Sequence, residues 1–142
     1  MWKELLLVAT VLAGAEPKAL NGPEIIAAFD GHTISGAYAD GTAFRETYHT
    51  GGRINYWDPR GDFTGTWSVT NNLFCTFYDQ PGDSQGLVGG CFRVEMIGRN
   101  CFDFLVAAAS SEEALDPKAR PQYTARGSID GAPSTCPDPL QV

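Results

Sequence analysis

Short runs of β-branched and aromatic residues, cut at close intervals by glycine turns, dominate residues 31–69. Asp40-Gly41 and Gly51-Gly52 are the clearest turns. In the run 62–70, apolar and small residues alternate with hydroxyl residues, namely Phe63, Gly65, Trp67 and Val69 with Thr64, Thr66 and Ser68. Alternation with a period of two is typical of a strand with one buried and one solvated face. The stretch therefore predicts antiparallel strands joined by tight turns.

The same pattern continues beyond residue 70. We expect about seven strands, at 32–39, 42–50, 53–57, 62–70, 73–78, 91–97 and 101–107. Strands that follow one another in sequence order form an up-and-down meander. Because closure removes exposed strand edges, we expect the meander to form a small barrel or a sandwich, in a mainly β fold. At most one further strand is expected, near 123–129.

A short helix is expected before the first strand. Asn21 or Gly22 suits its N-terminal cap, Pro23 suits its first turn, and Asp30-Gly31 suits its end. About two turns of helix are marginal in isolation, so this helix must pack on the sheet, where it can plug one end of a barrel. Its expected buried residues are Ile25, Ile26 and Phe29.

The 142 residues, 43% of them apolar, suit a single domain. Residues 1–15 combine a polar start, an apolar run and small residues, which is typical of a secretory signal peptide. An N-terminal helix packed on the domain and a short anchor are the alternatives. The apolar run is shorter than the ~20 residues that span a bilayer, so no transmembrane segment is expected. We expect a β-barrel-like domain over 16–106, then a short helix near 112–115 and a Pro/Gly-rich tail within 107–142.

Four cysteines, Cys75, Cys91, Cys101 and Cys136, are an even number in a small chain with an export signal, which indicates disulfides. They allow three pairings, and the sequence does not choose among them. We favour Cys75–Cys91, which would join neighbouring strands, and Cys101–Cys136, which would pin the tail. Zinc sites usually bring cysteines in close pairs, and none occurs here, so no metal or cofactor is expected. The expected location is periplasmic or secreted.

The formal charge of −7 gives the chain an isoelectric point near 4.6. An acidic surface repels phosphate backbones, so nucleic acid is not an expected partner.

Several motifs between residues 20 and 106 give the chain a resemblance to a group of small secreted bacterial domains of unknown function. The motifs are 20–25 (LNGPEI), 31–36 (GHTISG), 40–44 (DGTAF) and 65–69 (GTWSV), followed by Cys75 and Cys91 in two later strands. The resemblance covers about two thirds of the chain and implies a periplasmic location and a small β fold with a leading helix. It supplies no catalytic residue and no substrate. Cys101, Cys136 and the long tail depart from the pattern of that group.

Two patterns are compatible with catalysis. Residues 82–86 match G-x-S-x-G, but Ser84 precedes a strand, whereas the nucleophile motif requires a strand-to-helix turn. A polar loop explains the glycines equally well. His49 with Asp40 or Asp62 suits a proton relay, but a solvated histidine at a strand end is the simpler interpretation. No catalytic residue is assigned.

Aromatic residues are numerous for so small a domain, and most are expected in the core. Trp57 is the best candidate for exposure, because it lies beside a turn with Pro59 two residues on. A ligand cup or a docking patch is the functional alternative, and its candidate residues are Tyr48, His49, Tyr56 and Trp57. We therefore expect an exported, non-catalytic module that binds an unknown protein or a small apolar ligand. A small envelope hydrolase and a structural accessory subunit of a larger envelope complex are the alternatives.

Overall fold

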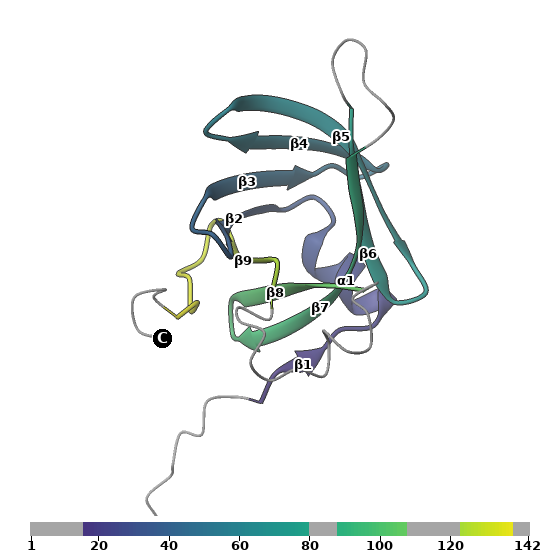
Figure 1. Cartoon of the computed structure of the whole chain (residues 1–142). Helices are drawn as coiled ribbons and strands as arrows, with labels where there is room; N and C mark the ends of the chain where they lie inside the picture. Colours follow the sequence, from purple (N-terminus) through teal and green to yellow (C-terminus); the bar gives the residue numbers. More distant parts are fainter. Residues whose placement is uncertain (1–15, 80–87, 108–122, 138–142) are drawn as a thin grey trace, which may run out of the picture.

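The computed structural model describes residues 16–79, 88–107 and 123–137, which form a mainly β fold with one short helix (Figure 1). The elements, in chain order, are β1 (Lys18–Ala19), α1 (Gly22–Phe29), β2 (Thr33–Tyr38), β3 (Ala43–Tyr48), β4 (Arg53–Asp58), β5 (Gly61–Thr70), β6 (Leu73–Tyr78), β7 (Val88–Gly98), β8 (Cys101–Val106) and β9 (Ala125–Ile129). The expected signal peptide at 1–15, the motif around Ser84 and the helix near 112–115 lie outside the described residues.

Eight strands form a closed antiparallel barrel. Each strand from β2 to β8 pairs with the next in the sequence, and β9 pairs with both β8 and β2. The up-and-down barrel is thus confirmed, with seven strands from β2 to β8 and the further strand expected near 123–129 present as β9. The barrel also extends past residue 106, where we had expected the domain to end. Without β9, the edges of β2 and β8 would lack partners, and unpaired edges are avoided in stable β folds.

The turns alternate between the two ends of the barrel, as up-and-down order requires. The β3–β4, β5–β6 and β7–β8 turns lie at one end, and the β2–β3 and β4–β5 turns lie at the other. In the β5–β6 turn, Asn71 and Asn72 have φ angles of 52° and 61°, as a tight two-residue hairpin requires. The Asn72 side chain accepts a hydrogen bond from the Gly22 N–H (2.8 Å). This contact anchors the start of α1 to the first end.

The helix begins at a capping box. The Asn21 side chain accepts a hydrogen bond from the Glu24 N–H (2.9 Å), and the Asn21 N–H donates to the Glu24 carboxylate (3.1 Å). Ile25 and Phe29 are buried, as expected. Ile26 is 45% exposed, which corrects the expectation that it is buried. Adjacent residues project about 100° apart around a helix, so only one of Ile25 and Ile26 can face the barrel.

Replacing Asn21 by alanine removes one half of the capping box. We expect the free energy of unfolding to fall by about 1 kcal/mol, because the Glu24 N–H in the first turn of the helix loses its side-chain acceptor. Denaturant unfolding measures the change. Asn21→Ser keeps a capping oxygen and is the matched control, expected to retain most of the stability. An unchanged midpoint for Asn21→Ala would contradict the role given to the cap.

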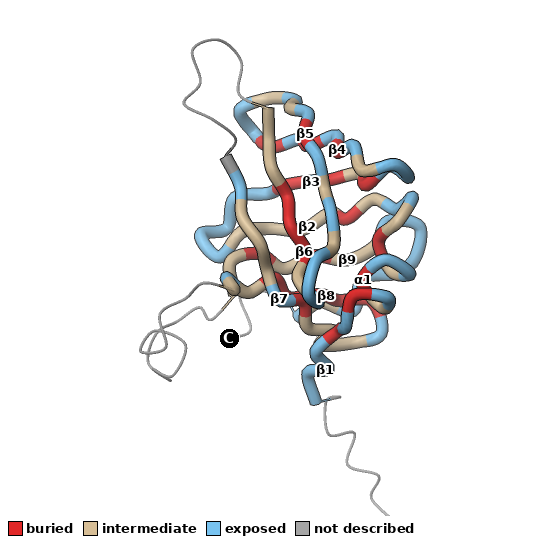
Figure 2. Tube along the Cα trace, turned by 90° about the vertical axis from the view of Figure 1, so that its right-hand side faces the viewer, coloured by how far each residue is buried: buried red, intermediate tan, exposed pale blue. Residues whose placement is uncertain are grey.

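Aromatic rings fill the end of the barrel at which α1 lies. The Phe29 ring from α1 packs edge-on against Phe74 and Phe102, with ring centroids 5.2 Å apart in both pairs. It also contacts Tyr48 and Phe104 at 5.7 and 5.8 Å. Figure 2 shows the buried residues of α1 and of the strands around it. The helix therefore plugs this end, as expected.

Two disulfides tie the barrel together. Cys75–Cys91 joins β6 to β7 at directly opposed positions, and Cys101–Cys136 joins the start of β8 to the segment after β9. Both match the pairing that we favoured among the three possible. The second disulfide holds the chain beyond β9 against the β7–β8 turn, where Asn100 also bonds to the backbone of Ile129. Across the described ranges, no helix is long and apolar enough to cross a membrane.

Candidate functional site

The barrel interior becomes polar toward the end opposite α1. The hydroxyl groups of Tyr38 and Tyr56 lie 2.8 Å apart, and the Tyr56 hydroxyl donates to the Asp58 carboxylate (2.9 Å). The Arg60 guanidinium bonds the same carboxylate, at 2.7 Å from its terminal nitrogen. Hydrogen bonds from Arg60 lower the pKa of Asp58 to about 2, and burial raises the pKa of Tyr38 to about 12. Asp58 is therefore an anion that fixes the tyrosines at this rim.

One carboxylate, that of Glu46 on β3, lies inside the barrel wall. Its residue is 7% exposed, and its oxygen accepts a hydrogen bond from the Tyr78 hydroxyl (2.6 Å). Burial raises the pKa of Glu46 to about 7, against the smaller opposing effect of the hydrogen bond from Tyr78. The fully buried Tyr48 hydroxyl lies near Glu46 but makes no hydrogen bond of regular geometry to a described residue. The Glu46 carboxylate is enclosed in the barrel, so its ionisation affects the stability of the fold rather than an exposed site.

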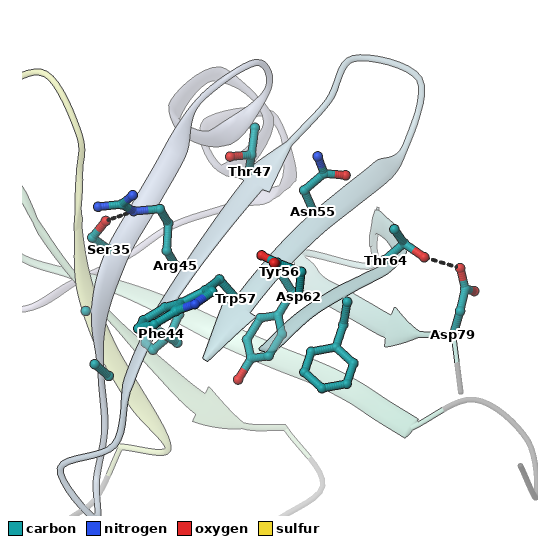
Figure 3. Close-up of a pocket in the computed structure, with 13 residues that line it drawn as sticks. Ser35, Phe44, Arg45, Thr47, Asn55, Tyr56, Trp57, Asp62, Thr64 and Asp79 are labelled. Carbon is teal, nitrogen blue, oxygen red and sulfur yellow. Dashed lines mark hydrogen bonds between the residues drawn. The ribbon is translucent and has the colours of Figure 1, made fainter. Parts of the chain in front are cut away.

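The outer face of β2–β5 carries an open groove of ≈ 980 Å³ (Figure 3). Four outward side chains form a row across the strands, because Ser35 pairs with Arg45, Arg45 with Trp57, and Trp57 with Asp62. A second row lies beside the first and consists of Thr47, Asn55 and Thr64. We call these seven residues the Trp57 groove. Figure 3 shows the Trp57 ring with Arg45 on one side and Asp62 on the other.

Trp57 is 43% exposed although it is large and apolar. Inward neighbours on β4 explain the exposure, because Tyr56 and Asp58 occupy the alternate positions that face the interior. The indole ring stands on the outer wall, where its exposed part can be covered by a molecule outside the barrel. Such a ring is the kind of residue that concentrates binding energy in a contact surface.

Several polar side chains of the groove are held in place by their neighbours. The Arg45 guanidinium donates to the Ser35 hydroxyl (3.2 Å) and lies 3.7 Å from the Asp130 carboxylate. The Thr64 hydroxyl donates to Asp79 (2.9 Å), which also accepts from Arg53 (3.1 Å). These hydrogen bonds lower the pKa of Asp79. Fixed side chains lose less conformational entropy when a ligand binds.

Other polar groups of the groove have no such partner within the described residues. No hydrogen bond there uses the Asn55 amide, the Trp57 indole N–H or the Asp62 carboxylate. Together they offer an amide donor and acceptor, an indole donor and carboxylate acceptors. A ligand on the Trp57 ring would meet these groups at its edges.

Comparisons of the chain with models of protein families, with curated proteins and with solved structures found no match. The geometry of the chain itself is therefore the basis for assigning a function. Among residues 16–79, 88–107 and 123–137, no group of three or more His, Cys, Asp or Glu side chains is arranged to hold a metal ion.

The four binding residues expected from the sequence do not form one site. Trp57 lies in the outer groove, whereas Tyr56 is buried inside the wall and Tyr48 is fully buried in the core against Phe29 and Phe74. His49 is exposed in the β3–β4 turn, at the end where α1 lies, and its carbonyl accepts a hydrogen bond from the Trp67 indole (2.9 Å). Of the four, Trp57 lines the cavity from its outward position and Tyr56 from its buried one, whereas Tyr48 and His49 do not line it.

The proton relay considered for His49 does not form. His49 follows β3, whereas Asp40 lies in the turn before β3 and Asp62 lies at the start of β5, both at the opposite end of the barrel. A strand of six residues such as β3 spans about 20 Å, far beyond hydrogen-bond reach. The length of the strand therefore separates His49 from both aspartates.

Arg45, Asn55 and Thr64 were missed as site residues, and Asp62 was considered only as a relay partner of His49. Each stands at a polar position in an alternating strand, which marks it as outward-facing but not as part of a site. Strand register brings them together around Trp57, and register depends on pairing between segments.

Proposed function

We propose that the protein is an exported, non-catalytic binding module, periplasmic or secreted, that binds its partner at the Trp57 groove. The observation that carries this proposal is the 43% exposure of Trp57 within a row of hydrogen-bonding side chains. Covering the exposed apolar surface of this ring with a bound partner removes it from water, which favours binding. The hydrolase alternative has no comparable observation among the described residues.

Export is supported by the two disulfides, because disulfides form and persist in oxidising compartments. The resemblance of residues 20–106 to small secreted domains points in the same direction. The pattern of residues 1–15 supplies the means of export, as a secretory signal peptide.

Replacing Trp57 by alanine tests the proposal. The ring lies on the outer wall, so we expect the free energy of unfolding to change by no more than ~0.5 kcal/mol. Capture of the partner is expected to be lost. Affinity purification from the native envelope, with mass spectrometry of the captured material, measures the second effect, and thermal unfolding measures the first.

Ile26→Ala is the matched control, because Ile26 is 45% exposed on α1, at the other end of the barrel. This variant is expected to capture the same material as the wild type. Equal capture by Trp57→Ala and the wild type would contradict the proposal. So would a large drop in melting temperature, since it would show that the ring is required for folding.

A further inference from the structure

The Trp57 groove is open and crosses four neighbouring strands. At a strand spacing of about 4.8 Å, the row from Ser35 to Asp62 crosses four strands and extends for about 15 Å. The row from Thr47 to Thr64 crosses three strands and runs beside it for about 10 Å. The surface therefore suits an elongated ligand of several linked units rather than one small compact molecule.

The charges of the groove are mixed. Arg45 is positive and Asp62 is negative. Asp79, which lines the same cavity beside Thr64, is also negative, and Arg45 and Asp79 each have an opposite charge beside them. The whole chain carries −7. An anionic polymer would be repelled, and a cationic one would find Asp62 as the single acidic side chain of the groove that has no ion pair within the described residues. Charge complementarity therefore favours an uncharged ligand.

The composition of the groove distinguishes among uncharged ligands. Phe44, Tyr56 and Phe63 line its floor as buried or half-buried rings, and Trp57 is the one exposed large apolar side chain in it, with hydroxyl, amide, carboxylate and guanidinium groups on neighbouring outward positions. A small apolar molecule requires an enclosed, mostly apolar pocket. A stable protein interface has an extensive buried apolar centre, whereas here the centre is a single ring.

A sugar ring has one face of C–H groups and a circumference of hydroxyl groups. The C–H face can lie on the indole ring, which presents the negative side of its quadrupole to the slightly positive hydrogens. The hydroxyl groups can then bond to Asn55, Asp62 and Arg45, whose donors and acceptors surround the ring. From this match we infer that the ligand of the Trp57 groove is an uncharged glycan chain. The inference rests on the proposed function and names its ligand class.

Titration with uncharged tetrasaccharides tests the inference. The probes are cellotetraose, maltotetraose and tetra-N-acetylchitotetraose. Binding of each probe to the protein is measured by isothermal titration calorimetry. We expect at least one of them to bind with a Kd of about 1 mM or tighter, and its monosaccharide to bind at least about tenfold more weakly. Tetragalacturonate, which is a polyanion of the same length, is the charged control and is expected not to bind.

Variants connect the binding to the groove. Trp57→Ala is expected to weaken binding of the preferred tetrasaccharide by about tenfold or more, and Trp57→Tyr to retain much of it, since a flat ring remains. Asn55→Ala and Asp62→Ala are each expected to weaken it by about fivefold, the loss of one or two hydrogen bonds. Ile26→Ala is expected to bind as the wild type does.

The inference is overturned if no uncharged tetrasaccharide binds at concentrations up to about 10 mM, or if Trp57→Ala binds the preferred probe as the wild type does. Its failure is distinguishable from that of the proposed function. If envelope capture depends on Trp57 but no tetrasaccharide binds, the groove binds a partner of another class, and the glycan inference alone is wrong. If neither depends on Trp57, both are wrong.

Discussion

Replacing Phe29 by alanine is expected to lower the free energy of unfolding by about 4 kcal/mol. Phe29 is fully buried and makes ring contacts with Tyr48, Phe74, Phe102 and Phe104, which come from β3, β6 and β8. Alanine would leave a cavity between these strands and α1, and a closed barrel has little freedom to collapse around it. A domain of this size has about 5–15 kcal/mol in total, so the loss is a large part of its stability.

Guanidinium unfolding, followed by circular dichroism, measures this loss. Phe29→Leu fills most of the space and is expected to lower the free energy of unfolding by about 1 kcal/mol. Ile26→Ala, on the exposed side of the same helix, is expected to change it by less than about 0.5 kcal/mol. A loss of about 1 kcal/mol or less for Phe29→Ala would mean that α1 does not close the barrel in solution.

The second large effect is on the pH dependence of stability, and it depends on Glu46. Burial raises the pKa of Glu46 from 4.5 to about 7 in the folded protein. Below about pH 4.5 the group is protonated in both states, and its contribution to stability is fully present. As the pH rises further, the unfolded chain releases the proton first, so the free energy of unfolding falls until the folded group ionises near pH 7. The total fall from this one residue is about 3 kcal/mol.

Glu46→Gln removes the titration while keeping an oxygen that can accept the hydrogen bond from Tyr78. We expect the variant and the wild type to have similar stability near pH 4, and the variant to be more stable by as much as about 3 kcal/mol at pH 8. Denaturant unfolding across this pH range measures the difference. Identical pH dependence in the two proteins would show that Glu46 is not enclosed as described.

Tyr78→Phe supplies an internal check on the same group. The Tyr78 hydroxyl donates to Glu46 and partly offsets the effect of burial on its pKa. Its loss should raise the pKa of Glu46 further, because the carboxylate loses a donor. The fall in stability is therefore expected to extend to a higher pH than in the wild type.

Local patterns in the sequence predicted the strands and the helix well. The alternation over 62–70 is present in β5, whose residues switch between less and more exposed positions along its length. The Asn21 cap and the end of the helix at Asp30 were also readable, because both depend on residues close in sequence. The exposure of Trp57 was expected for the same reason, since a turn lies next to it.

The strand β9 was harder to predict than the others, because Ala125–Ile129 (ARGSI) has no aromatic residue and a single β-branched residue, Ile129. Its pairing with β2 and β8 decides its structure. Gly127 opposes Gly36 across β2, and a Cβ atom at Gly36 would lie 2.0 Å from the Arg126 carbonyl oxygen. The two glycines allow this close approach. The position of a glycine in the sequence does not indicate which strand it will oppose.

The site was less predictable than the fold. Phe44, Glu46 and Tyr48 stand at alternate positions of β3, and all three are buried. Nothing near Glu46 in sequence indicated that Tyr78, from β6, would donate to it. Likewise, the neighbours of Trp57 come from β3 and β5, so the groove exists only once the strands are in register.

Closure of the barrel through β9 has a consequence for biosynthesis. Most strand pairs join neighbours along the chain, but Ile34 pairs with Ile129, and the last described strand supplies the seam. Until residues 125–129 have been synthesised, one edge of β2 and one edge of β8 have no partner strand. Long-range pairing of this kind is slow to form. A chain truncated shortly before residue 125 should therefore aggregate through these edges, although it contains seven of the eight barrel strands.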